Sequence, residues 1–95
     1  MMQNLKIYKD MEREEVKKVV VEVVKDKLGF EEVTEESSLK NDLGADSLDN
    51  VEICMELENR LEVVVTDEES DKLFSDDATV KKVINFFHER KCQQS

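Results

Sequence analysis

Proline is absent from this chain of 95 residues, and glycine occurs only twice, at Gly29 and Gly44. These two residue types mark the frequent turns of β-sandwiches and barrels, so their scarcity favours a few long helices. Residues 11–28 support this expectation, because apolar side chains recur there at helical spacing with charged residues between them. The β-branched run VVVEVV would favour a strand by propensity alone, but the pattern is too long for one and ends in Leu-Gly, a typical helix stop. We therefore expect the first helix at residues 11–28.

Three more helices and one long loop are expected in the rest of the chain. The loop should cover residues 29–45 and be fixed by scattered apolar side chains, namely Phe30, Val33, Leu39 and Leu43. The second helix should begin near Ser47, with Asp46 as its N-cap, and end near Leu61. A capping box at TDEE, residues 66–69, predicts a short helix ending near Leu73.

The last helix should begin at Thr79, bury one apolar face, and place basic residues at its negative C-terminal end. The triplet VVV at residues 63–65 is interpreted as an extended anchor for the connector. The predicted fold is thus all-α, a small four-helix bundle with three longer helices and one short one. We divide the chain into an N-terminal extension (1–10), a helical domain (11–91) and a tail (92–95).

The charge balance restricts the functions that such a chain can have. There are 24 acidic and 14 basic residues, which give a formal net charge of −10. A domain of this size buries only about 60–65% of its unfolded surface, so we expect neither a second domain nor a large enzyme. The acidic excess disfavours nucleic-acid and anionic-membrane binding and favours partners with basic surfaces. No apolar run approaches the roughly 20 residues of a membrane span, so no membrane insertion is expected.

Two cysteines make neither a disulfide framework nor a zinc cluster, and no CxxC or HxxxH spacing is present. We interpret Cys54 as a small core residue and Cys92 as a free thiol in the tail, and we expect no structural metal site. His88, the single histidine, is interpreted as a solvated side chain. We expect a monomer in the bacterial cytoplasm, with an organelle matrix as the alternative if a transit peptide was removed.

The second helix has two apolar faces on a wheel of about 100° per residue. One face, Ile53, Leu57 and Leu61 with Cys54 at its edge, is assigned to the core. The opposite face is apolar at its centre and acidic at its rim: Leu48, Val51 and Met55, flanked by Asp49, Glu52, Glu56, Asn59 and Glu62. Geometry alone leaves two interpretations open, scattered exposed residues without a function or a docking surface for a partner.

The start of this helix carries LGADSLDNVE, residues 43–52, which resembles the acyl carrier protein family. The resemblance extends over roughly residues 11–90 and implies that Ser47 receives a 4′-phosphopantetheine arm from coenzyme A. The thiol of that arm would carry acyl chains as thioesters, and Asp46 would help to hold a magnesium ion during the transfer. The position suits this chemistry, because the first turn of a helix offers free N–H groups and a positive dipole end to a phosphate.

The family resemblance implies a carrier for fatty-acid synthesis without catalysis of its own. No base accompanies Ser47 in the sequence, so a phosphopantetheinyl transferase must supply the base and the metal. The other implied partners are fatty-acid synthesis enzymes with basic docking patches and acyltransferases. The expected docking residues are Leu48, Asp49, Val51, Glu52, Met55 and Glu56. The expected acyl pocket, between the second and last helices, consists of Ile53, Leu57, Leu61, Val83 and Phe87.

Other functions share some of these features. A specialised carrier for a polyketide, aminoacyl or lipid pathway would have the same attachment motif, whereas a structural acidic adaptor would leave Ser47 unmodified. A calcium-binding loop does not fit, because no stretch has alternating oxygen ligands followed by the glycine of an EF-hand. Thr66 stands where the family commonly has a proline, the connector LFSDDATV is longer than usual, and Arg60 dilutes the acidity of the second helix. These departures bear on the partners more than on the family.

Overall fold

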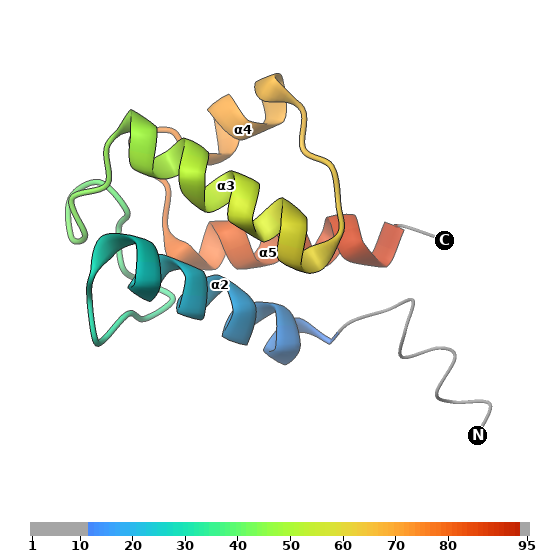
Figure 1. The fold of residues 1–95 in the computed structure, drawn as a ribbon, viewed down its shortest axis with the longest axis horizontal. Coiled ribbons are helices and arrows are strands. Elements are labelled where there is room, and N and C mark those ends of the chain that lie inside the picture. Colours follow the sequence, from blue (N-terminus) through green and yellow to red (C-terminus); the bar gives the residue numbers. More distant parts are fainter. Residues whose placement is uncertain (1–11, 94–95) are drawn as a thin grey trace.

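The computed structural model describes residues 12–93, and these contain four helices and no strand. The helices are α2 (Arg13–Leu28), α3 (Ser47–Leu61), α4 (Asp67–Leu73) and α5 (Val80–Gln93). In Figure 1, α3 lies between α2 and α4, and α5 runs behind them. The all-α prediction is confirmed. The expected extension, residues 1–10, lies outside the described residues, as do the last two residues of the tail.

Local signals in the sequence fix the ends of the helices. The first helix begins at Arg13, two residues later than the periodicity predicted, and the Glu15 carboxylate accepts a hydrogen bond from the Glu12 backbone N–H at 3.3 Å. It ends at Gly29, whose φ of 77° is a left-handed conformation that costs glycine nothing. The short helix α4 begins with the predicted capping box, in which Thr66 Oγ1 accepts from the Glu69 N–H at 3.1 Å.

The core is formed by the inner faces of three helices, and all of its members are apolar. The residues with no more than 1% exposure are Val16, Val20, Val23, Val24, Ile53, Leu57, Leu61, Val80, Val83, Ile84 and Phe87. They include every residue of the expected acyl pocket and, apart from Cys54, which is 5% exposed, of the expected core face of the second helix. The β-branched residues of α2 therefore form a helix because they pack against α3 and α5, which outweighs their strand propensity.

The connector after α3 has the predicted extended conformation. Val63 is buried, Val64 is 73% exposed and Val65 is half-buried, which is the alternation of an extended segment. Polar contacts hold its backbone: Glu58 Oε2 accepts from the Val65 N–H at 2.7 Å, and Arg90 donates to the Val64 carbonyl at 2.6 Å. The segment is thus fastened to α3 on one side and to α5 on the other.

The long loop before α3 is attached to the start of α5. The Leu39 N–H donates to the Ala78 carbonyl at 3.1 Å, and Val80 donates to the Ser37 carbonyl at the same distance. Leu39 and Leu43 are buried, as expected. The prediction for Phe30 is wrong, because this side chain is 39% exposed at the turn that follows α2. Gly29 reverses the chain there, and Phe30 is thereby directed away from the core.

Candidate functional site

Ser47 is the first residue of α3 and is exposed at the tip of the helix. Asp46 precedes it as the N-cap, and its Oδ1 accepts from the Asp49 N–H at 2.9 Å. Asp49 in turn accepts from the Asp46 N–H at 3.2 Å, which completes a capping box. The two carboxylates thus fix the first turn, and Ser47 stands beside the positive end of the helix dipole.

Hydrogen bonds and a buried side chain fix the turn that precedes Ser47. Ala45 is buried and donates its N–H to the Leu39 carbonyl at 2.7 Å, while Asp42 Oδ2 accepts from the Ser38 N–H at 2.8 Å. Gly44 has a φ of 70°, a conformation that a residue with a Cβ adopts only with strain. In the sequence Leu-Gly-Ala, Leu43 and Ala45 are thus buried in the core, and the turn at Gly44 leaves Ser47 exposed at the start of the helix.

A cavity opens beside Ser47, between the start of α3 and the end of α4. Its volume is about 320 Å³, and its walls are Leu39, Lys40, Ala45, Asp46, Ser47, Asn50, Phe74, Ser75 and Asp76. A second hollow of about 150 Å³ adjoins it and shares Ser47, Asn50 and Phe74. Lys40 and Asp76, on opposite walls, form an ion pair at 3.2 Å. A chain attached to Ser47 would start at the opening of this cleft.

Asn50 has an unusual place in this cleft. Its Oδ1 is buried and has no hydrogen-bond partner among the described residues. Leaving such an acceptor unpaired costs on the order of 1–3 kcal/mol, so a donor from water or from a bound group would be stabilised there. No sequence motif marks Asn50 or Phe74, because the cleft forms only where the end of α4 returns to the start of α3.

The outer face of α3 is apolar at its centre, as predicted. Leu48 is 66% exposed, Val51 is 51% exposed and Met55 is 59% exposed, and these residues follow one another along the helix. Glu52 is exposed beside them, and Asp49 is half-buried because it serves the capping box. The structure thus brings an apolar stripe and acidic groups together on one accessible surface.

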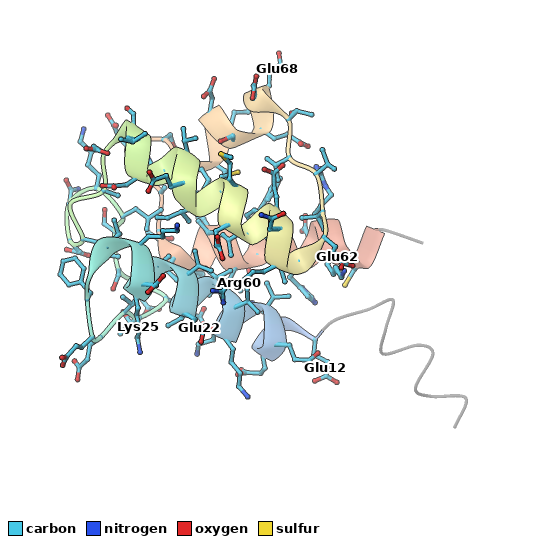
Figure 2. The ribbon with its side chains drawn as sticks, viewed as in Figure 1. Glu12, Glu22, Lys25, Arg60, Glu62 and Glu68 are labelled. Carbon is cyan, nitrogen blue, oxygen red and sulfur yellow. The ribbon has the colours of Figure 1, made fainter. Side chains whose placement is uncertain are left out.

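The acidic rim of this face is partly neutralised at its far end. Arg60 donates to Glu56 at 2.9 Å and to Glu22 of α2 at 2.7 Å, and Figure 2 shows Arg60 and Glu22 pointing toward one another. Hydrogen bonding to these two carboxylates raises the pKa of Arg60. On this face, Asp46, Asp49 and Glu52 form no ion pair with another described residue, so the negative charge of the rim is stronger at the end near Ser47.

The other chemically reactive side chains lie away from Ser47. Within residues 12–93, no group of three or more His, Cys, Asp and Glu side chains is arranged to hold a metal ion. Cys54 is buried, and that burial raises the pKa of its thiol. His88 is near the end of α5, far from the start of α3 (Figure 1). No described helix is long and apolar enough to cross a membrane.

Comparisons with known proteins agree with this geometry. Residues 18–87 match the family model described as "Phosphopantetheine attachment site". The chain is 42% identical over 78 residues to the acyl carrier protein of Rubrobacter xylanophilus, covering 80% of this chain and 91% of the relative. It is 38% identical over 80 residues to that of Chloroherpeton thalassium, covering 82% and 95% respectively.

The fold is also similar to a solved structure. The acyl carrier protein from Enterococcus faecalis, described for its high thermal stability, superposes with a TM-score of 0.67 at 29% sequence identity. The match covers 84% of this chain and 99% of that one. The similarity thus includes the helices on both sides of the cleft, and it leaves part of this chain without a counterpart.

Proposed function

The chain belongs to the acyl carrier protein family, and from this premise we propose that Ser47 is the residue that bears its 4′-phosphopantetheine arm. The observation that carries the proposal is the exposed serine at the first position of α3, at the opening of the cleft. When attached, the arm supplies a terminal thiol on which acyl groups are carried as thioesters. The protein is then a carrier, and its own residues position and protect the cargo.

We assign separate tasks to the residues around Ser47. The helix tip stabilises the negative charge of the phosphodiester through free N–H groups and the dipole. The Asp46 carboxylate holds the cap through Oδ1, and it is the group we propose as the magnesium contact during attachment. The base that removes the serine proton comes from a phosphopantetheinyl transferase. Coenzyme A then gives up its phosphopantetheine to the serine oxygen, and adenosine 3′,5′-bisphosphate leaves.

The test is the intact mass of the protein after incubation with coenzyme A, magnesium and a phosphopantetheinyl transferase. We expect a mass gain of one phosphopantetheine group in the parent protein and none in Ser47→Ala. Ser75→Ala is the matched control, because Ser75 lines the same cleft and should leave the gain intact. An unchanged parent mass, or an equal gain in Ser47→Ala, would remove the proposal and favour an unmodified structural adaptor.

We further propose that the outer face of α3 docks basic partner proteins. Leu48, Val51 and Met55 supply the apolar centre, and Asp49, Glu52 and Glu56 supply the acidic rim. The partners are the transferase, fatty-acid synthesis enzymes and acyltransferases with basic patches around an apolar site. Such an arrangement steers association through charge and holds the complex through apolar contact. The bacterial relatives support fatty-acid synthesis in the bacterial cytoplasm as the setting.

The proposed shelter for the acyl chain is the interior between α3 and α5. Ile53, Leu57, Leu61, Val83 and Phe87 are fully or almost fully buried there. An alkyl chain in water costs about 0.8 kcal/mol per CH₂, which favours entry of the chain among these side chains. Because the core is closely packed, the chain must displace them, and the cleft beside Ser47 is the shortest route inward.

A series of acyl lengths on the modified protein tests this shelter. We expect the melting temperature to rise with chain length until the space is filled, because a group that gains contacts only in the folded state stabilises it. A melting temperature that does not depend on chain length would place the chain in solvent or on the surface.

A further inference from the structure

The last two turns of α5 carry a pair of metal-binding side chains that the carrier function does not use. His88 Nε2 and Cys92 Sγ are 3.6 Å apart, four residues along one helix face. Cys92 is exposed and His88 is half-buried. The pair is at the C-terminal end of α5, whereas Ser47 begins α3 at the other end of the bundle (Figure 1).

The separation of these two atoms fits coordination of a single zinc ion. Tetrahedral zinc binds sulfur at about 2.3 Å and nitrogen at about 2.0–2.1 Å, which places the two ligand atoms about 3.5–3.6 Å apart. The side chains therefore already have the spacing of two zinc ligands. In the metal-free protein, the thiol and the imidazole form a hydrogen bond at this distance. Zinc would replace the thiol proton, which passes to solvent.

Two ligands are half of a zinc site, and we propose that the same pair on a second copy of this chain completes it. Protein zinc sites generally have four ligands, or three and an open position. Within residues 12–93 no third His, Cys, Asp or Glu joins the pair. A two-fold arrangement of two chains would supply two sulfurs and two nitrogens from identical residues. Zinc would thus bridge two carrier molecules, tail to tail, and leave both Ser47 sites accessible.

The neighbouring basic side chains leave the pair accessible to a cation. The two neighbouring basic residues are directed elsewhere: Arg90 donates to the Val64 carbonyl at 2.6 Å and pairs with Glu69, and Lys91 donates to the Leu61 carbonyl at 2.7 Å. The net charge of −10 disfavours association of two copies without metal. A divalent cation at the contact offsets part of this repulsion, so association should depend on the metal.

The experiment uses the untagged, reduced, full-length chain carrying Ser47→Ala, so that no arm thiol can act as a ligand. Cobalt(II) replaces zinc as the spectroscopic probe, and zinc is added in sedimentation experiments. We expect thiolate-to-cobalt charge-transfer absorption and tetrahedral visible bands that saturate at one metal per two chains. Zinc should bleach these bands and convert the monomer to a dimer, and a chelator should reverse the change.

Single substitutions identify the ligands. Cys92→Ser and His88→Gln should each abolish the charge-transfer bands or weaken metal binding at least tenfold, and both should remain monomeric with zinc. Cys54→Ser is the matched control for the other cysteine, and it should behave as the parent, because Cys54 is buried. The helical circular dichroism of each variant shows whether it is folded.

Several results would overturn the inference. They are absence of thiolate absorption, the same absorption in Cys92→Ser, or saturation at one metal per chain without dimer formation. None of these results bears on the attachment of the arm at Ser47, because that is read from the mass of the protein with Ser47 intact.

Discussion

The two helices on either side of the cleft, α3 and α4, are held in place by different forces. The long helix α3 buries Ile53, Cys54, Leu57 and Leu61, whereas α4 buries no residue. Polar contacts contribute more to the placement of α4, namely the Thr66 capping box at its start and the ion pair between Glu69 and Arg90 of α5, and only Leu73 and Phe74 at its end pack, partly buried, against the core. The cleft beside Ser47 therefore lies between a helix anchored in the core and a helix with few buried contacts, which should open more readily.

The lengths and sequences of the two helices explain this difference. The sequence DEESDKL of α4 has one apolar residue in seven and no apolar stripe. Such a short helix is unstable by itself, so contacts at its ends decide whether it forms. The helix that begins with Ser47 is thus anchored in the core, and the helix on the other side of the cleft has no fully buried residue.

Removing apolar volume from α3 should have the largest effect. Leu57→Ala should lower the free energy of unfolding by about 3 kcal/mol, because Leu57 is fully buried and a cavity would remain. Urea denaturation followed by circular dichroism measures the change. Met55→Ala is the control on the exposed face of the same helix, and it should change stability by less than about 0.5 kcal/mol. Equal losses in both variants would mean that the two faces of α3 are not energetically distinct.

The outer face of α3 should show a moderate effect on partner binding at little cost in stability. Met55→Asp should weaken docking to a basic synthesis enzyme about tenfold, mainly through faster dissociation. Glu52→Lys should mainly lower the association rate, and the difference from the parent should become smaller as salt is added. Stopped-flow binding at two ionic strengths separates the two. Parent-like binding by Glu52→Lys at low salt would show that the acidic rim is only a solvated surface.

The starts of α3 and α4 were predictable from the sequence because capping is local. Asp46 and Asp49 are three residues apart, and Thr66 and Glu69 have the same spacing, so each box can be identified without knowing the fold. Apolar periodicity likewise predicted the buried and exposed faces of α3. What local patterns cannot specify is which side chains meet across distant segments, and Phe30 shows that an apolar residue in a loop can remain exposed.

The cleft and its polar wall could not be predicted for the same reason. Asn50 and Phe74 line the same cleft only because the connector after α3 brings α4 back to the start of α3. The contact between Arg60 and Glu22 is similarly a product of packing between α2 and α3. The attachment residue could be predicted from the sequence because it lies in a contiguous motif, residues 43–52. The assignment to Ser47 stays a prediction until the mass of the modified protein is measured.

The ion pair that holds α4 should give a smaller, pH-dependent effect. Hydrogen bonding from Arg90 lowers the pKa of Glu69 from 4.5 to about 2. A carboxylate whose pKa is lower in the folded state stabilises the protein above the unfolded pKa, and this stabilisation is lost as the pH falls from about 4.5 to about 2. Glu69→Gln should therefore speed amide hydrogen exchange in α4 near neutral pH. It should also reduce the loss of unfolding free energy as the pH falls from about 4.5 to about 2.

The matched control for this substitution is Glu68→Gln on the same helix. Glu68 points away from the rest of the protein at the tip of α4 (Figure 2), so its loss should leave exchange in α4 unchanged. Exchange in α3 should be slow in all three proteins, because its amides open only with the core. If exchange in α4 is as slow in Glu69→Gln as in the parent, apolar contacts rather than the ion pair hold this wall.

The smallest effect we expect is that of salt on the melting temperature, and it tests whether repulsion between the acidic side chains of α3 lowers stability. On α3, Glu52 and Glu56 lie at i, i+4 spacing, which destabilises a helix, but Arg60 neutralises Glu56 at 2.9 Å. The melting temperature should therefore rise by only about 2–4 °C between low ionic strength and 0.15 M sodium chloride. Magnesium at matched ionic strength should give a larger rise, because a divalent ion can bridge neighbouring carboxylates such as those of Asp46 and Asp49.

Arg60→Ala should increase the rise in melting temperature with salt, because it removes the ion pair that offsets the repulsion between Glu52 and Glu56. If the parent and Arg60→Ala respond alike, or if neither cation raises the midpoint, charge repulsion along α3 does not limit stability, and the contrast between α3 and α4 rests on apolar burial alone.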